Sequence, residues 1–176
     1  HLFTTGAFLQ YLKHLTADGV VIISRRLLLP PADCLRLWAS AYEGLRMFGS
    51  RNPADHLAIL RNWDTFVLLV FKQPLQPATT THLENFAENL NFDIVFLPRI
   101  KSDQANRFNK FDAPYHFIEV NRLASAYRKG QEKEYFKSYL LDIQPQLAKE
   151  LGRVGQQDRR SDLNRLDFDL RDRLFL

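Results

Sequence analysis

The sequence lacks the patterns that mark several common classes of protein. Its single cysteine, Cys34, excludes an intrachain disulfide and a cysteine-based metal site. Its longest uninterrupted apolar run, residues 66–71, has the length of a strand and falls short of the ~18 residues that a membrane-spanning helix needs. No G-x-G occurs among its seven glycines, so this sequence carries no glycine-rich loop of the kind that cradles a dinucleotide.

Patterns for metal and nucleic-acid binding are missing as well. No H-x-H or H-x-x-x-H spacing exists, so we expect structural histidines rather than metal ligands at His14, His56, His82 and His116. The 24 lysines and arginines are interspersed with 20 acidic residues, and the net charge is +4. Binding of nucleic acid needs a clustered basic face, so we expect no nucleic-acid partner.

Enough apolar residues are present to build a core, since hydrophobic residues make up 45% of the chain and aromatic residues 12%. Apolar spacing, caps and turn residues predict alternating helices and strands. The expected helices are one capped by Thr4-Thr5 and ending near Leu15, then Ala32–Phe48, Thr79–Leu90, Pro114–Lys129 and Glu132–Leu141. The expected strands are Val20–Ile23, His56–Arg61, Thr65–Phe71 and Phe92–Leu97.

Two of these strand patterns also indicate how the strands pair. Val20–Ile23 is a continuous β-branched run, typical of a strand covered on both faces in a parallel sheet. The connection Asn62-Trp63-Asp64 is too short for a parallel crossover, so its flanking strands should form an antiparallel hairpin. Farther on, residues 152–173 hold six arginines and five aspartates, which predicts a solvated tail or a frayed helix.

The beginning of the sequence has the pattern expected in the middle of a longer series of alternating helices and strands. It opens on His1, without an initiator methionine, and enters a helix followed by a buried strand. We therefore expect the C-terminal half of a larger α/β protein, with the half that carries the chemistry lying upstream.

Several short segments, in this order, support a family resemblance. Each segment is similar to a pattern found in that family. Phe3–Phe8 approximates Y-T-x-x-A-F, Leu12–Gly19 matches L-x-x-L-x-x-D-G, Asn106–Asn109 matches N-x-F-N, and Tyr139–Pro145 matches Y-x-x-D-I-x-P. Together with the long helix and the hairpin after it, residues 3–146 resemble the C-terminal half of a class I S-adenosylmethionine-dependent methyltransferase domain. More narrowly, they resemble the spermidine/spermine-synthase-like proteins.

The resemblance implies an α/β fold, the C-terminal half of a Rossmann-like methyltransferase sheet. Its order would be helix-strand-helix, antiparallel hairpin and helix-strand, with a helical appendage. Residues 1–98 would form the half-domain, residues 99–146 the appendage, and residues 147–176 a charged tail. Members of the family continue past D-I-x-P into an acidic T-D-D-x-P-F-F segment, whereas Gln146–Glu150 stands here, so the tail departs from the family.

The resemblance also implies a function for the intact parent. It would transfer an aminopropyl or methyl group from decarboxylated S-adenosylmethionine or S-adenosylmethionine to an amine. In the family, the glycine loop and the acidic residues that hold the ribose and serve the amine come from the other half. This chain alone is therefore expected to bind no cofactor and to be inactive. The alternative is a non-catalytic interaction or scaffold module derived from the same fold.

Partners and location follow from the same resemblance. The partner would be the missing N-terminal half of the domain or a second copy of the chain. Some bacterial members are fused to a membrane-embedded segment, which implies a place at the cytoplasmic face of a membrane for a membrane-anchored parent. No membrane span is expected within this chain.

Ser24, Arg25 and Arg26 are the candidate substrate-binding residues because they end the first strand, and ligands of open α/β sheets bind outside the carboxyl ends of strands. Arg25 would hold a carboxylate through its bidentate fork. The alternative is a solvated arginine paired with Asp33 or Glu43. Cys34 lies near a helix N-terminus, but no histidine and acid pattern marks it as a nucleophile, so we expect a buried, inert thiol. No catalytic residue is predicted.

Overall fold

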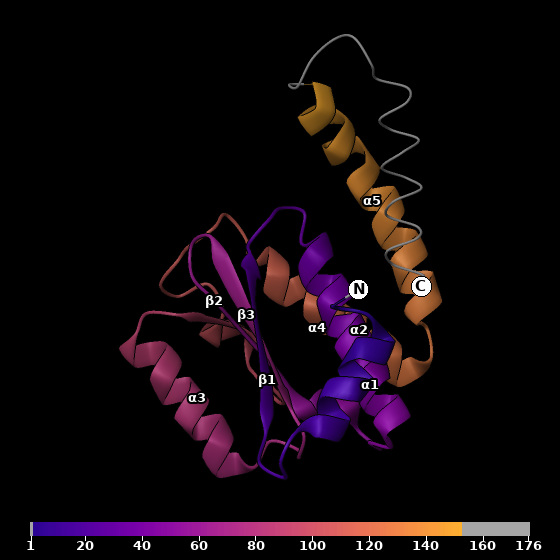
Figure 1. Ribbon diagram of the computed structural model, residues 1–176. Coiled ribbons are helices and arrows are strands. Elements are labelled where there is room, and N and C mark those ends of the chain that lie inside the picture. Colours follow the sequence, from indigo (N-terminus) through magenta and orange to yellow (C-terminus); the bar gives the residue numbers. More distant parts are fainter. Residues whose placement is uncertain (1, 153–176) are drawn as a thin grey trace. The chain divides into compact units, whose positions relative to one another are not determined.

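The computed structural model describes residues 2–152, with side chains described for residues 2–143. The chain forms two compact units, His1–Ala124 and Ser125–Leu176. The elements are α1 (Thr5–His14), β1 (Val20–Arg26), α2 (Ala32–Phe48), the 3-10 turn η1 (Pro53–His56), β2 (Leu57–Arg61), β3 (Thr65–Phe71), α3 (Pro77–Asn89), β4 (Asp93–Phe96), the 3-10 turn η2 (Ser102–Gln104), α4 (Tyr115–Lys129) and α5 (Glu132–Gly152) (Figure 1).

A four-stranded sheet in the order β1-β3-β2-β4 organises the first unit. Every neighbouring pair is antiparallel, with β1 and β3 in register from Val20 opposite Phe71 to Arg26 opposite Thr65. The described chain is therefore mixed α/β. The predicted order of helix, strand, helix, hairpin, helix and strand is confirmed.

The predicted parallel environment of Val20–Ile23 is wrong. β1 is an edge strand that pairs antiparallel with β3, and the side chain of Ile22 is 62% exposed. The physical reason is that a β-branched run favours an extended strand without specifying the direction of its neighbour. The direction is set by the β2–β3 hairpin, whose second strand returns between β2 and β1.

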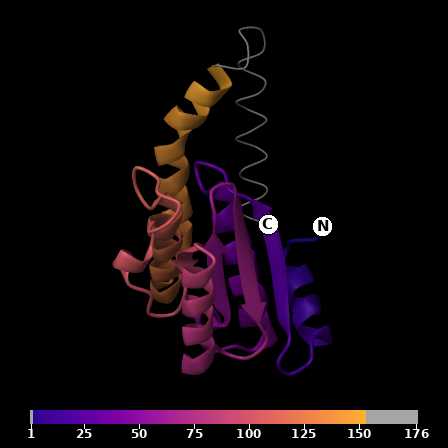
Figure 2. The same ribbon diagram turned by 90° about the vertical axis from the view of Figure 1, so that its left-hand side faces the viewer.

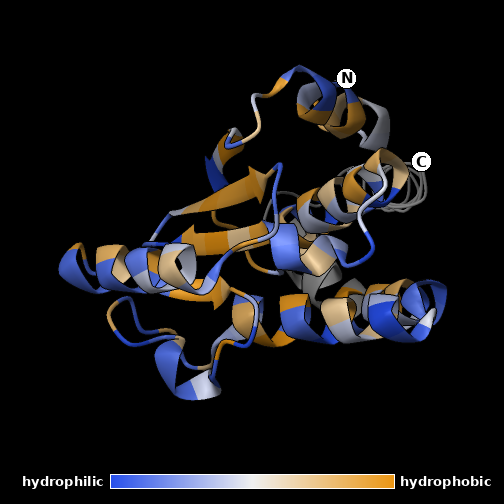
Figure 3. Cartoon of the chain, turned by 90° about the horizontal axis from the view of Figure 1, so that it is seen from below, coloured by the Kyte–Doolittle hydropathy of each residue, from blue (hydrophilic) through white to orange (hydrophobic). Residues whose placement is uncertain are grey.

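Helices cover both faces of this sheet, with α1 and α2 on one side and α3 on the other (Figures 1 and 2). The strands between them are predominantly hydrophobic (Figure 3). On the first side, α2 buries Leu35, Trp38 and Leu45 completely. Helix α1 lies close against α2 because Gly44 has no side chain, and a Cβ there would lie 2.6 Å from the Cβ of Phe8.

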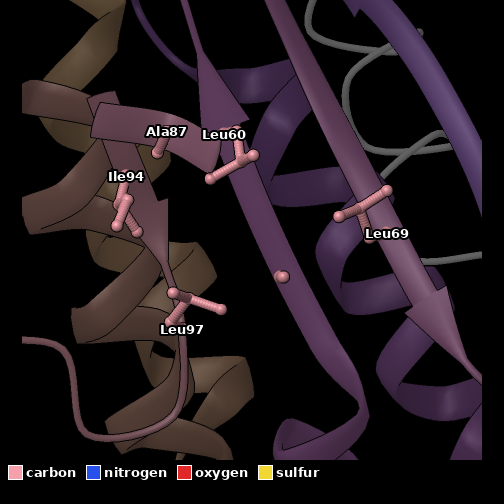
Figure 4. Close-up of a cluster of buried hydrophobic side chains, with 6 residues drawn as sticks. Leu60, Leu69, Ala87, Ile94 and Leu97 are labelled. Carbon is pink, nitrogen blue, oxygen red and sulfur yellow. The ribbon is translucent and has the colours of Figure 1, made fainter. Parts of the chain in front are cut away.

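On the opposite side, α3 closes a smaller cluster over β2 and β4. Its members are Ala58, Leu60, Leu69, Ala87, Ile94 and Leu97 (Figure 4). Ala87 is the one residue of α3 that is fully enclosed, while the partly buried Leu83 packs against the cluster beside it. Helix α3 does not extend over the edge strand β1, so the side chain of Ile22, which lies on the same face of the sheet, is exposed.

Several predicted elements are confirmed at the residues where local signals are strong. Helix α2 spans Ala32–Phe48, and Gly49 ends it with a φ of 105°, a backbone conformation that glycine adopts readily. The hairpin turn is confirmed too, since the Asn62 side chain accepts hydrogen bonds from the backbone N–H of Asp64 (3.1 Å) and Thr65 (2.8 Å).

In the second unit, α5 extends to Gly152 rather than ending at Leu141. Along α5, Tyr135 stacks on Tyr139 with ring centroids 5.9 Å apart and meets Phe136 edge-on at 5.5 Å. Most of the predicted charged tail, residues 153–176, lies outside the described residues. None of the helices described between residues 2 and 152 combines the length and the hydropathy that a membrane span requires.

Candidate functional site at the carboxyl end of β1

The loop after β1 is fastened to two other segments at one end of the sheet. The backbone N–H of Leu27 donates to the carbonyl of Asp64 in the hairpin turn. The carbonyl of Leu28 lies 3.1 Å from Nε2 of His116, in the first turn of α4. A carbonyl oxygen only accepts, so Nε2 carries the proton of this imidazole and donates it to Leu28.

His116 is one of the buried titratable groups of this region. Its side chain is 1% exposed. Burial and, to a smaller extent, the positive charge of Arg61 lower its pKa to about 4, and the hydrogen bond to Leu28 opposes part of this shift. The imidazole is therefore neutral at pH 7, and its Nδ1 lone pair has no hydrogen-bond partner among the described residues.

Beneath the loop lies a buried ion pair between the end of β2 and the start of β4. Arg61 Nη2 is 3.4 Å from Asp93 Oδ2, and the two side chains are 4% and 0% exposed. The same Nη2 donates to Asn106 Oδ1 (2.9 Å) and to the Asn109 carbonyl (2.7 Å). Burial lowers the pKa of Arg61, and the charge of Asp93 works against that shift. With these partners, the guanidinium is compensated where water does not reach it.

Asp93 organises the loop that follows β4. Its two carboxylate oxygens accept hydrogen bonds from three successive backbone N–H groups, those of Arg107, Phe108 and Asn109. The Asn109 side chain then donates to the carbonyl of Asn91, just before β4 (2.8 Å). The N-x-F-N segment is thus wrapped around one buried carboxylate and held rigidly against the sheet.

Phe111 connects this polar cluster to the surface. Its ring covers the guanidinium of Arg61 at 4.5 Å and meets the ring of Trp63 edge-on at 6.0 Å. The Asn106 side chain exchanges two hydrogen bonds of 2.8 Å with the backbone of Phe111 and so fixes the position of that ring. The indole of Trp63 therefore rests on a support that the buried ion pair holds in place.

Large apolar side chains are exposed next to the hydrogen bonds that hold this loop. They are Leu28, Leu29, Trp63 and Tyr115, and we call them the rim. The exposed fractions are 51% for Leu28, 50% for Leu29, 60% for Trp63 and 40% for Tyr115. The rim offers aromatic and aliphatic surface on a rigid backbone, a combination that suits contact with the apolar part of a ligand or with another protein segment.

The structure places the three predicted substrate-binding residues beside this rim. Ser24, Arg25 and Arg26 are the last residues of β1, and all three are exposed. Arg25 Nε donates to Asp33 Oδ2 at 3.1 Å, which is the ion pair that the alternative interpretation names. Within the described part of the chain, Arg26 makes no ion pair. Binding of substrate by these residues stays a prediction.

The cysteine and the second buried histidine have structural environments. Cys34 is buried as predicted, and burial together with the charge of Asp33 raises the pKa of its thiol, which keeps it protonated and unreactive. His56 donates from Nδ1 to the Phe71 carbonyl (3.0 Å), and its Nε2 then accepts from the Ser50 hydroxyl (2.9 Å). Across the described residues, no group of histidine, cysteine and carboxylate side chains is arranged to hold a metal ion.

Sequence reasoning missed the cluster of Arg61 and Asp93. A signal existed, because each is a single charged residue at the end of an apolar strand pattern, HLAILR and FDIVF. When such a charge is enclosed it needs a buried partner, and here the two asparagines of N-x-F-N supply the remaining contacts. In the comparisons with known proteins, no family, no curated protein and no solved structure matches this chain.

Proposed function

We propose that this chain is the distal half of a spermidine-synthase-like transferase domain of the Rossmann-like, S-adenosylmethionine-dependent type. The outer edge of β1 would be the seam at which the cofactor-binding half continues the sheet. The complete domain would transfer an aminopropyl or methyl group to an amine.

The observation that carries the proposal is the open edge of β1. This strand pairs with β3 on one side, and among the described residues nothing pairs with its other side. Its Ile22 side chain is 62% exposed on the sheet. An uncovered β-branched edge is an aggregation hazard that folded proteins avoid, so a further strand beside β1 is the simplest completion of the domain.

The order of elements gives separate support. The resemblance calls for a helix, a strand, a long helix, an antiparallel hairpin, a helix and a strand, and α1, β1, α2, β2–β3, α3 and β4 follow that order. The N-x-F-N segment that contributes to the resemblance encloses the buried carboxylate of Asp93, which gives that short motif a structural role.

In the proposed reaction, the lone pair of the acceptor amine attacks the carbon next to the sulfonium sulfur. The new C–N bond would form as the C–S bond breaks, the sulfur would leave as a neutral thioether, and the positive charge would pass to the nitrogen, which would then release a proton to solvent. Acceleration comes mainly from holding the nucleophile in line with that carbon. This chain would supply the back of the sheet, and the rim beside β1 would form part of the acceptor pocket wall.

The alternative is a scaffold module that uses the same fold without catalysis. The open edge of β1 favours this alternative as well, because another protein can cover it by adding a strand. The two functions differ in whether a cofactor half exists for this chain.

The test is calorimetric titration with S-adenosylmethionine and its decarboxylated form. It uses this 176-residue chain and the protein that is read in frame from the coding sequence upstream of His1. We expect heat only from the extended protein, whose added segment should contain a G-x-G loop. An extended protein without such a loop or without binding would favour the scaffold. Micromolar binding by the short chain alone would show that it builds a cofactor pocket by itself and would refute the proposal.

A further inference from the structure

Ser50, His56 and the carbonyl of Phe71 form a chain of hydrogen bonds at the end of the sheet opposite to the rim. Ser50 lies two residues after α2, His56 ends η1, and Phe71 ends β3 beside the start of β1. Nδ1 of His56 donates to the Phe71 carbonyl (3.0 Å), which leaves Nε2, 2.9 Å from Ser50 Oγ, as the acceptor of the hydroxyl proton. A serine, an imidazole and a fixed acceptor in this order are the arrangement that activates a serine nucleophile.

The backbone on either side of this pair fixes its geometry. Gly49 and Ser50 donate their backbone N–H groups to the carbonyls of Arg46 and Leu45, so the chain turns sharply at the end of α2. The φ of 105° at Gly49 permits this turn. His56 directly precedes β2, so a different element positions the imidazole. Serine and base are therefore held together by two separate elements of the first unit.

The hydroxyl is accessible, whereas the base is shielded from water. The side chain of His56 is 6% exposed, while Ser50 is half-buried and its neighbours Gly49, Arg51 and Asn52 are exposed. The backbone N–H of Arg51 makes no hydrogen bond to the described residues. The N–H of the residue after a nucleophilic serine is a common donor to the oxyanion of the tetrahedral intermediate. The small and polar neighbours of Ser50 suit short acyl groups better than long aliphatic ones.

We propose that Ser50 and His56 act as nucleophile and general base in the hydrolysis of short-chain acyl esters. Ser50 Oγ attacks the carbonyl carbon of the ester while its proton passes to His56 Nε2. The tetrahedral intermediate then expels the alcohol, which takes that proton, and the acyl group stays on Ser50 as an ester. Water attacks this acyl-serine with the same imidazole as base, so a carboxylic acid leaves and the hydroxyl is restored. The activity is separate from the function proposed above, because it needs neither the cofactor half nor the rim.

The third group of the hydrogen-bond chain determines how the reaction can be observed. The Phe71 carbonyl fixes the tautomer of His56 as a carboxylate would, but it carries no charge to stabilise the imidazolium that forms. Both steps should therefore be slower than in a hydrolase with an aspartate in this place. With p-nitrophenyl acetate, whose leaving group needs little protonation, acylation is the faster step. The acetyl-serine should then accumulate and be detectable by mass.

The first experiment treats the folded chain with p-nitrophenyl acetate and, separately, with a fluorophosphonate probe that forms a stable adduct with activated serines. Peptide mass spectrometry locates the modified residue. We expect one acetyl or phosphonyl group per chain, at Ser50. Ser50→Ala should lose this modification, whereas Ser102→Ala, at an exposed serine in η2, should keep it. A wild-type chain that carries no modification at Ser50 would overturn the proposal.

The second experiment tests the base. His56→Gln should slow the fluorophosphonate labelling of Ser50 by at least about 100-fold, because general-base catalysis contributes roughly 10²–10⁴-fold. The wild type unfolded in urea should lose labelling to a similar extent, since unfolding separates serine and imidazole, and this comparison does not depend on the folding of a variant. Equal labelling rates in the folded and the unfolded wild type would show that Ser50 is not activated. Undiminished labelling of a His56→Gln variant with native circular dichroism would contradict the proposal as well.

Discussion

The buried ion pair makes a demanding prediction for Arg61→Met. Methionine fills much of the same volume but removes the charge beside Asp93, the hydrogen bonds to Asn106 and Asn109, and the stacking on Phe111. Asp93 would keep its three backbone donors but lose its counter-charge in a site that is 0% exposed. Removing one partner of a buried pair costs about 3–5 kcal/mol, so we expect the free energy of unfolding to fall by that amount.

The same loop offers a matched control. Arg107 forms an ion pair of 3.2 Å with Glu88, but these side chains are 43% and 59% exposed. Exposed pairs contribute about 0–1 kcal/mol, so Arg107→Met should change the free energy of unfolding by less than about 1 kcal/mol. Urea unfolding followed by circular dichroism measures both variants. The reasoning is refuted if Arg61→Met and Arg107→Met have the same stability within about 1 kcal/mol.

Three further predictions address packing, pH dependence and reactivity. Gly44→Ala should lower the free energy of unfolding by about 1–3 kcal/mol, because the new Cβ would lie 2.6 Å from the Cβ of Phe8. Gly6→Ala is the control, since a Cβ there has free space and should not destabilise the protein. Thermal unfolding compares the two variants. The pKa of His116 is lowered from 6.5 to about 4 on folding, so the unfolded chain takes up a proton first as the pH falls. Stability should therefore drop by roughly 3 kcal/mol between about pH 6.5 and pH 4, and His116→Gln should remove that part of the pH dependence in unfolding titrations. The thiol of Cys34 should react with a thiol reagent only at the rate of unfolding, and fast labelling of the native protein would contradict its burial.

Local signals were enough to predict helix α2 and the β2–β3 hairpin, whereas they placed the end of α5 at Leu141 instead of Gly152. Helix α2 begins after Pro31 and ends at Gly49, residues whose backbone preferences act at short range. The hairpin turn is likewise fixed by neighbours, since the side chain of Asn62 binds the backbone two and three residues farther on. In such places, the sequence and the structure agree because the determining contacts lie within a few residues.

The remaining features depend on contacts between residues far apart in the chain. The direction of pairing at β1 is decided by β3, more than forty residues later, so the run Val20–Ile23 could not indicate it. The environment of Arg61 depends on Asn106 and Asn109, whose separation along the chain hides their proximity in space. Only the single charge at each strand end pointed to the cluster, without naming its partners.

The hydrogen bonds from three successive backbone amides to Asp93 have a consequence for amide hydrogen exchange and for engineered insertions. Residues 107–109 have no regular secondary structure, yet their N–H groups end on a buried carboxylate. They should exchange as slowly as strand amides and form an island of protection inside an irregular loop. Peptide tags or cleavage sites placed there would break these hydrogen bonds and release the loop from the start of β4, so residues 107–109 are a poor place for an engineered insertion.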